Sequence, residues 1–304
     1  MKKKNKNNQN PLNPYKKRLG DRKDGRRIRT IEPLTIVEPF FMKTRNDANN
    51  LIQDYIDLSY INSYIREKKA AGLKNFNAMH VLISTYVRTV SQKPGINRFV
   101  SGYRLFARNS IDVIMEVKKE LALNAPATMV KFHFAPDSTA EEVYHEMNNK
   151  IEAYWNEETK ENAFDKVARL LKYIPRWIFS LLRKIFDILD YFGKLPKFLL
   201  EVSPFHGSMV ITSMASLGIP SIFHHLYNFG NIPMFISFST ARHTYEMNKD
   251  GKVEQKHYLD INFTTDDRIC DGQYYASALH QMRVLLKNPK LLDKKPEAII
   301  PDIR

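Results

Sequence analysis

Two spacings of hydrophobic residues run along the chain, and they predict a mixture of strands and helices. Runs rich in β-branched and aromatic residues predict strands. The predicted strands cover residues 51–58, several short stretches of 99–117, and 129–134, 209–212, 234–239, 240–247 and 253–263. Apolar positions at helical spacing predict helices over residues 59–71, 77–92, 138–155, 163–200 and 273–286. Because the two kinds of element alternate without a repeat or a linker, we expect one α/β body from residue 31 to residue 304.

Short polar motifs indicate where several of these elements begin and end. Asn77 is a helix cap, and Pro94 stops the helix that it opens. Ser138 and Glu141 have the spacing of a capping box that opens the predicted helix 138–155. The polar turn 248–251 joins two strand patterns and predicts a hairpin.

An uncharged stretch lies between Glu201 and Arg242, with no Asp, Glu, Lys or Arg over forty residues. Several glycines and prolines and three histidines interrupt it, whereas a membrane-spanning helix needs about 20 apolar residues in series. We expect buried strands, covered on both faces, and closely packed loops.

The positive charge is concentrated at one end of the chain. Of the formal net charge of +14, residues 1–30 carry +10. Their first half is Lys, Asn, Gln and Pro with few apolar residues, so we predict a basic, disordered arm over residues 1–30. A solvated arm is the simplest interpretation. Since no recognition helix or RNA-binding signature follows it, nucleic-acid binding is only a minor hypothesis for the arm.

Composition excludes several classes of protein. With 43% hydrophobic and 26% charged residues the chain is an ordinary globular protein. Its single cysteine rules out an intrachain disulfide and a cysteine-rich metal centre, and no metal site is expected. The basic start is not followed by an apolar segment, so a secretory signal is not predicted and we expect a cytoplasmic protein.

Three motifs in order along the chain resemble one family. The last is Thr265-Asp-Asp-Arg-Ile-Cys-Asp-Gly272, followed by a helix and a leucine-rich turn ending at Asn288-Pro289. Ile211–Gly218 and Lys93–Phe99 supply the other two. Together they resemble the catalytic domain of the dihydrolipoamide acyltransferases of 2-oxo acid dehydrogenase complexes, itself similar to chloramphenicol acetyltransferase. The resemblance spans roughly residues 31–292.

The resemblance implies a fold, an assembly and a set of site residues. The fold would be a chloramphenicol acetyltransferase-like two-layer sandwich, a mixed sheet with helices on one face. The assembly would be a homotrimer with its sites between subunits. Coenzyme A, as an acyl thioester, would be the substrate. Thr212 or Ser213 would donate to the oxyanion, and Arg268 with Asp271 would form an orienting pair ahead of Gly272. A structural turn and ion pair is the alternative for the last three residues.

One position departs from the family pattern. Asp267 stands where the family has the histidine that deprotonates a thiol. With a pKa of about 3.9 an ordinary carboxylate is a poorer match to a thiol at about 8.5 than imidazole at about 6.5. Burial can raise a carboxylate's pKa by about 3–5 units. We therefore expect an acyltransferase with Asp267 as base or polariser, or alternatively a catalytically inactive relative that serves as a scaffold or binding module.

Other residues near these motifs have plainer interpretations. His206, His224 and His225 are candidates to replace the missing base, but core or interface packing is the simpler assignment. Cys270 is expected to be a small buried hydrophobe rather than a nucleophile.

A second departure is an amphipathic helical insertion over about residues 160–202, basic and rich in aromatic residues. Such a segment can lie on a membrane surface, so an inactive scaffold could contact a membrane through residues 164–200. Alternatively, the segment can pack on the protein itself. The short arm leaves no room for a lipoyl domain, so any lipoyl group would arrive on another protein.

Overall fold

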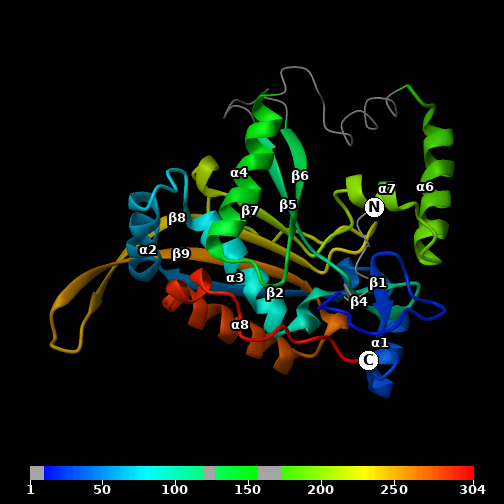
Figure 1. Ribbon diagram of the computed structural model, residues 1–304, viewed down its shortest axis with the longest axis horizontal. Helices are drawn as coiled ribbons and strands as arrows, with labels where there is room; N and C mark the ends of the chain where they lie inside the picture. Colours follow the sequence, from blue (N-terminus) through cyan, green and yellow to red (C-terminus); the bar gives the residue numbers. More distant parts are fainter. Residues whose placement is uncertain (1–9, 119–126, 157–172) are drawn as a thin grey trace, which may run out of the picture.

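A six-stranded mixed sheet organises the chain, of which the computed structural model describes residues 10–118, 127–156 and 173–304 (Figure 1). Its strand order is β2-β9-β8-β7-β5-β6. The strands are β2 (Asn49–Asp57), β5 (Ile111–Lys118), β6 (Ala127–Phe134), β7 (Met209–Ser213), β8 (Met234–Met247) and β9 (Val253–Asp266). β7 runs parallel to both β5 and β8, and the other pairs are antiparallel. The predicted strands 234–239 and 240–247 are one strand with a bulge between Phe238 and Ala241.

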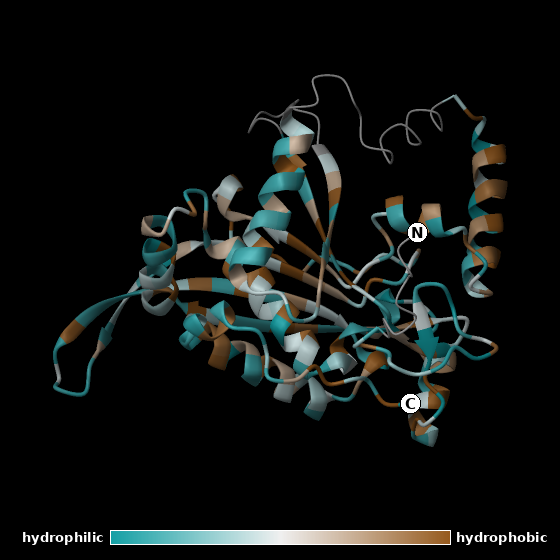
Figure 2. Ribbon diagram, in the orientation of Figure 1, coloured by the Kyte–Doolittle hydropathy of each residue, from teal (hydrophilic) through white to brown (hydrophobic). Residues whose placement is uncertain are grey.

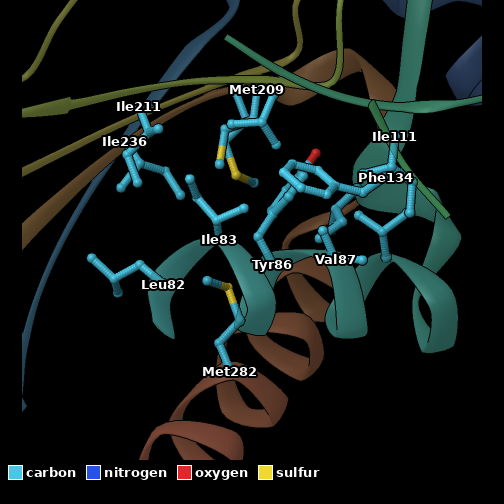
Figure 3. Close-up of a cluster of buried hydrophobic side chains, with 14 of the residues drawn as sticks. Leu82, Ile83, Tyr86, Val87, Ile111, Phe134, Met209, Ile211, Ile236 and Met282 are labelled. Atoms are coloured by element: carbon cyan, nitrogen blue, oxygen red, sulfur yellow. The ribbon is translucent and has the colours of Figure 1, made fainter. Parts of the chain in front are cut away.

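Four helices cover one face of this sheet and bury most of the core (Figures 1 and 3). They are α2 (Leu58–Ala70), α3 (Ala78–Gln92), α4 (Ala140–Asn156) and α8 (Gly272–Lys287). α3 lies at the centre, where Ile83 and Tyr86 are buried against Met209 and Ile211 of β7. This confirms the two-layer α/β arrangement expected from the sequence.

The helix caps match the sequence motifs with one shift. Asn77 caps α3 as predicted, since its side chain accepts a hydrogen bond from Met79 N at 3.0 Å. The capping box of α4 lies one residue later than predicted: Thr139 N donates to Glu142 Oε2 at 2.8 Å and Glu142 N donates to Thr139 Oγ1 at 3.3 Å. Threonine and glutamate supply the same pair of oxygens as the Ser138–Glu141 spacing, so the motif alone did not decide between them.

The N-terminal region packs against the body, which differs from the predicted arm. β1 (Gly25–Arg27) pairs with β4 (Arg104–Arg108), and β3 (Arg98–Ser101) completes a small three-stranded sheet. Arg22 is buried and binds both Asp24 and Asp190. Its charge is neutralised by a neighbour, Asp24, and by Asp190, which is distant in sequence, so the density of basic residues did not indicate disorder for residues 10–30. α1 (Pro33–Phe41), which follows, was also not predicted.

The insertion forms two helices at the edge of the molecule, α6 (Arg176–Tyr191) and α7 (Lys197–Val202) (Figure 1). Pro175 caps the start of α6, and residues 193–196 separate α6 from α7 within the single helical stretch 163–200 that the sequence predicts. The part of that prediction before residue 173 lies outside the described residues. Among the described residues, no helix is long and apolar enough to cross a membrane.

The uncharged stretch is only partly buried. The first half of β8 is buried throughout, as expected. Residues 215–229 instead form a surface loop, where Leu217 is 62% exposed and Phe223 is 42% exposed. The lack of charge therefore did not mean burial over this part.

Candidate functional site

The segment 266–272 joins the end of β9 to α8, and most of its polar side chains are engaged internally. Arg268 binds Asp266 through two nitrogens, Nε to Oδ1 at 2.8 Å and Nη2 to Oδ2 at 2.7 Å. Its third nitrogen donates to the carbonyl of Met42 at 2.9 Å. Both side chains are buried, and Arg45 lies 3.9 Å from the same carboxylate. Since burial of an unpaired charge is costly, this cluster holds the segment in place.

Asp271 caps α8 and does not contact Arg268. Its carboxylate accepts a hydrogen bond from Tyr274 N at 2.7 Å. The predicted pair of Arg268 with Asp271 is therefore not formed; the partner of Arg268 is Asp266, two residues earlier, which a fork-shaped guanidinium can reach with both arms. Gly272 begins the helix, and a Cβ there would meet nothing within 4 Å, so packing does not require glycine.

Asp267 is half-buried at the start of this turn. Its Oδ1 accepts a hydrogen bond from Asn50 Nδ2 of β2 at 2.5 Å. Among the described residues, no other hydrogen bond or ion pair engages this carboxylate. Glu38 of α1 lies nearby, and burial together with the charges of Asp267 and Asp271 raises the pKa of Glu38. Asp267 thus keeps one oxygen available in an acidic environment.

Thr212 and Ser213 are the last two residues of β7, a strand inside the sheet between β8 and β5. Thr212 shares a face with Val210, the face opposite the four helices, and both hydroxyl-bearing residues are partly exposed. Thr212 lies opposite Ser237 of β8, whose hydroxyl is bonded to the backbone of Ile222. No hydrogen bond of the Thr212 hydroxyl occurs within the described chain, so it can donate to a ligand.

The structure does not bring Thr212 and Asp267 together within one chain. Thr212 lies opposite Ser237, and Ser237 lies opposite Asn262, five residues before Asp267. At about 3.4 Å per residue along a strand and about 4.8 Å between strands, the two residues are roughly 20 Å apart. A ligand the size of an acyl thioester's reacting group therefore cannot contact both in one copy.

None of the candidate replacement bases forms a hydrogen bond or ion pair with Asp267 in the part of the chain that the structure describes. His206 is buried, with Nδ1 2.8 Å from Ser203 Oγ and Nε2 3.4 Å from Asp190 Oδ1. Burial lowers the pKa of His206, although Asp190 opposes the shift. The rings of His224 and His225 stack on each other, and His224 stacks on Phe235. All three pack within the chain.

Two further observations concern cofactors and nucleophiles. Cys270 is buried, and burial raises the pKa of its thiol strongly, so it is not a nucleophile at neutral pH. Among residues 10–118, 127–156 and 173–304, no cluster of three metal-ligating side chains occurs.

A cavity of about 250 Å³ lies beside Arg268, with Lys43 and Arg45 also in its wall. The wall also holds Asp187 and Asp190. Because Arg45 and Arg268 contact Asp266, Lys43 is the cation of this wall that remains for an anionic ligand group. Sequence reasoning missed Asn50, Arg45 and Lys43, because their part in this site depends on strand pairing and on the path of α1.

Comparison with known proteins rests on structure alone, since no family model and no curated protein matches the sequence. A probable dihydrolipoamide acetyltransferase from Listeria monocytogenes superposes with a TM-score of 0.54 at 12% identity, covering 90% of this chain and 97% of that one. The cubic core of a pyruvate dehydrogenase multienzyme complex gives 0.53 at 11%, covering 85% and 88%. Chloramphenicol acetyltransferase gives 0.51 at 14%, covering 86% and 100%. The chain has the fold that these acyltransferases share.

Proposed function

We propose that the protein transfers an acyl group between a coenzyme A thioester and a thiol or another acceptor, with Asp267 in place of the usual histidine. The observation that carries the proposal is the contrast within segment 266–272. Structural contacts engage the side chains of Asp266, Arg268 and Asp271. Asp267, in contrast, keeps one carboxylate oxygen available. Such an oxygen can accept or orient the proton of an attacking thiol.

The separation of Thr212 from Asp267 supports a site shared between copies, and we propose a homotrimer. The face that carries Thr212 also presents Leu51 and Tyr55 of β2, which are 57% and 59% exposed. An exposed apolar surface of this kind favours contact with another subunit. The similar pyruvate dehydrogenase core is a cubic assembly, which is consistent with an oligomer. In such an assembly, Thr212 of one copy would stabilise the oxyanion beside Asp267 of the next.

The first test is calorimetric titration of coenzyme A and acetyl-coenzyme A into the full chain. Saturable binding in the micromolar range is expected, and Lys43→Ala should weaken it if the cavity beside Arg268 receives the phosphates. Absence of heat at millimolar ligand would overturn the proposal.

Turnover then tests the roles of the two residues. Acetyl transfer from acetyl-coenzyme A to dihydrolipoamide, which forms an acetyl thioester of dihydrolipoamide and releases free coenzyme A, is measured by separating the two products. Its rate should fall on the order of 100-fold or more in Thr212→Val and at least as far in Asp267→Ala. Asp250→Ala, in the exposed hairpin turn, is the control and should retain full activity. Mixing the two inactive variants should restore part of the activity, because a shared site pairs an intact Thr212 with an intact Asp267. Activity that stays absent in every mixture would contradict the shared site.

A second candidate function is that of an inactive relative that binds a membrane surface through α6. Trp177, Leu181 and Ile188 of α6 and Phe192 at its end are 71%, 52%, 58% and 66% exposed. Figure 2 shows hydrophobic residues along this helix. Lysine and arginine side chains flank it; within the described chain Arg176, Lys184 and Lys194 form no ion pair. Basic amphipathic helices with aromatic residues bind anionic lipid. Co-sedimentation with vesicles containing phosphatidylserine, lost in Trp177→Ala and unaffected by Asp267→Ala, would favour this candidate.

A further inference from the structure

An apolar cavity of about 380 Å³ lies between α6, α7 and the loops on either side of β7. Its wall is built from Phe179, Leu182 and Phe186 of α6, Leu199 of α7, and Phe205 and Phe229 of these loops. The volume lies within the range of small-molecule sites, about 300–1,000 Å³. Side chains from three separate segments thus converge on one apolar space.

Apart from Arg183, the polar side chains in this wall are Ser203 and His206, which face other polar groups of the chain and offer little to a polar ligand. Ser203 Oγ accepts a hydrogen bond from Phe205 N at 3.2 Å and contacts His206 Nδ1 at 2.8 Å. Nε2 of His206 faces Asp190 at 3.4 Å. A polar group that entered here would lose its hydration without gaining partners, which costs free energy. The body of a suitable ligand is therefore hydrocarbon.

The wall of this cavity includes one positively charged side chain among its described residues, Arg183. The guanidinium of Arg183 lies over the ring of Phe229, 4.2 Å from its centroid, and contacts the carboxylate of Asp187 one turn further along α6. The Arg183 and Asp187 side chains are 37% and 51% exposed, and a pair so exposed contributes little. A guanidinium has five donors, so it can also bind a ligand carboxylate at small cost. The charge at this cavity favours an anionic end group.

We propose that this cavity binds the hydrocarbon chain of a long-chain fatty acyl group, with the carboxyl end at Arg183. The chain would pack among Phe179, Phe186 and Phe229. The acyl group can arrive as a free fatty acid or as its coenzyme A thioester; the chain is common to both. The site is separate from Asp267 and does not depend on the proposed acyl transfer.

The two sides of α6 allow the cavity to be tested apart from surface adsorption. Leu182 lines the cavity, whereas its neighbour Leu181 points outward and is 52% exposed. Leu182→Trp fills the cavity, and Leu181→Trp makes the same chemical change on the outer face. Leu199→Phe fills the cavity more mildly if the first variant fails to fold, which circular dichroism would show.

The experiment is titration of cis-parinaric acid into the full chain below its critical micelle concentration, followed by displacement with palmitate or palmitoyl-coenzyme A. Saturable binding of one molecule per chain is expected, at least 10-fold weaker in Leu182→Trp and unchanged in Leu181→Trp. Arg183→Met should weaken palmitate but not its methyl ester. Displacement by palmitate indicates the free acid, and displacement by palmitoyl-coenzyme A alone indicates the thioester.

Two outcomes would overturn the proposal. One is the absence of saturable binding in the wild-type chain. The other is equal loss in Leu181→Trp and Leu182→Trp, which would place the probe on the outer face, as at a membrane surface. Because no turnover is measured, these outcomes are distinct from failure of the acyltransferase proposal.

Discussion

Asp190 connects α6 to the N-terminal region, and its removal should weaken that connection by a measurable amount. Its Oδ1 lies 2.6 Å from Arg22 Nη2, and both side chains are nearly buried. Burial by itself would raise the pKa of Asp190, but the contacts with His206 and Arg22 outweigh it and lower the pKa to about 2. The carboxylate is therefore favoured in the folded chain.

The size of the effect follows from this pKa. A fall from the ordinary value of 3.8 to about 2 corresponds to about 2 kcal/mol, at about 1.4 kcal/mol per unit. Asp190→Asn should cost about this much at pH 7, because Arg22 keeps its second partner, Asp24. For a chain of 304 residues the melting temperature should fall by about 3 °C.

The contribution of Asp190 to the free energy of unfolding should fall as the pH is lowered. Since the pKa of the folded state is depressed, the contribution is complete above about pH 4 and is lost as the pH falls toward 2. The melting difference between wild type and Asp190→Asn should therefore be constant from pH 7 to 5 and shrink to about half near pH 3. Asp187→Asn, on the exposed side of the same helix, is the control and should shift melting by less than about 1 °C.

Differential scanning calorimetry and limited proteolysis of α6 would measure both effects. A melting difference that stays constant down to pH 3 would refute the electrostatic reasoning. Equal losses in Asp187→Asn and Asp190→Asn would refute the assignment to the buried pair.

Three other changes test local features of the structure. Gly230 has a φ of +85°, and a Cβ there would lie 1.9 Å from the carbonyl oxygen of Phe205, so Gly230→Ala should abolish or strongly reduce folding. Gly251 has a φ of +76° in an open turn, so Gly251→Ala should lower the free energy of unfolding by only about 1 kcal/mol, measured by thermal unfolding. Because burial raises the pKa of the Cys270 thiol, this cysteine should resist a thiol reagent at pH 8 in the native chain and react on unfolding in urea; rapid native labelling would contradict its burial. Asp271→Ala should destabilise the chain by about 1 kcal/mol through loss of the α8 cap, Asp271→Ser should restore most of it, and no recovery with serine would argue against a capping role.

The sequence determined most of the elements and the fold, for local reasons. Runs rich in β-branched and aromatic residues indicated β2 and β9, and Asn77 marked the start of α3, because strand propensity and helix caps depend on neighbours in the chain. Three motifs in order were enough to indicate the acyltransferase-like sandwich, and superposition with solved structures confirmed it.

Only the tertiary structure decided how the charged residues of the candidate site are used. Arg268 pairs with Asp266 and not with Asp271, because a bidentate contact in a buried turn depends on where β9 ends relative to α8. Asn50 reaches Asp267 through strand pairing between residues more than 200 apart.

The same holds for the basic N-terminal region and for the distance between site residues. Arg22 is satisfied by Asp190 from the insertion, a partner that charge counting along the chain cannot supply. Thr212 lies near the end of β7 and Asp267 follows β9, yet the register of β7, β8 and β9 places Thr212 two strands away and level with Asn262, five residues before Asp267. Local pattern thus specified the elements, whereas pairing between distant segments specified the site, because contacts across strands and helices are not encoded in any single stretch of sequence.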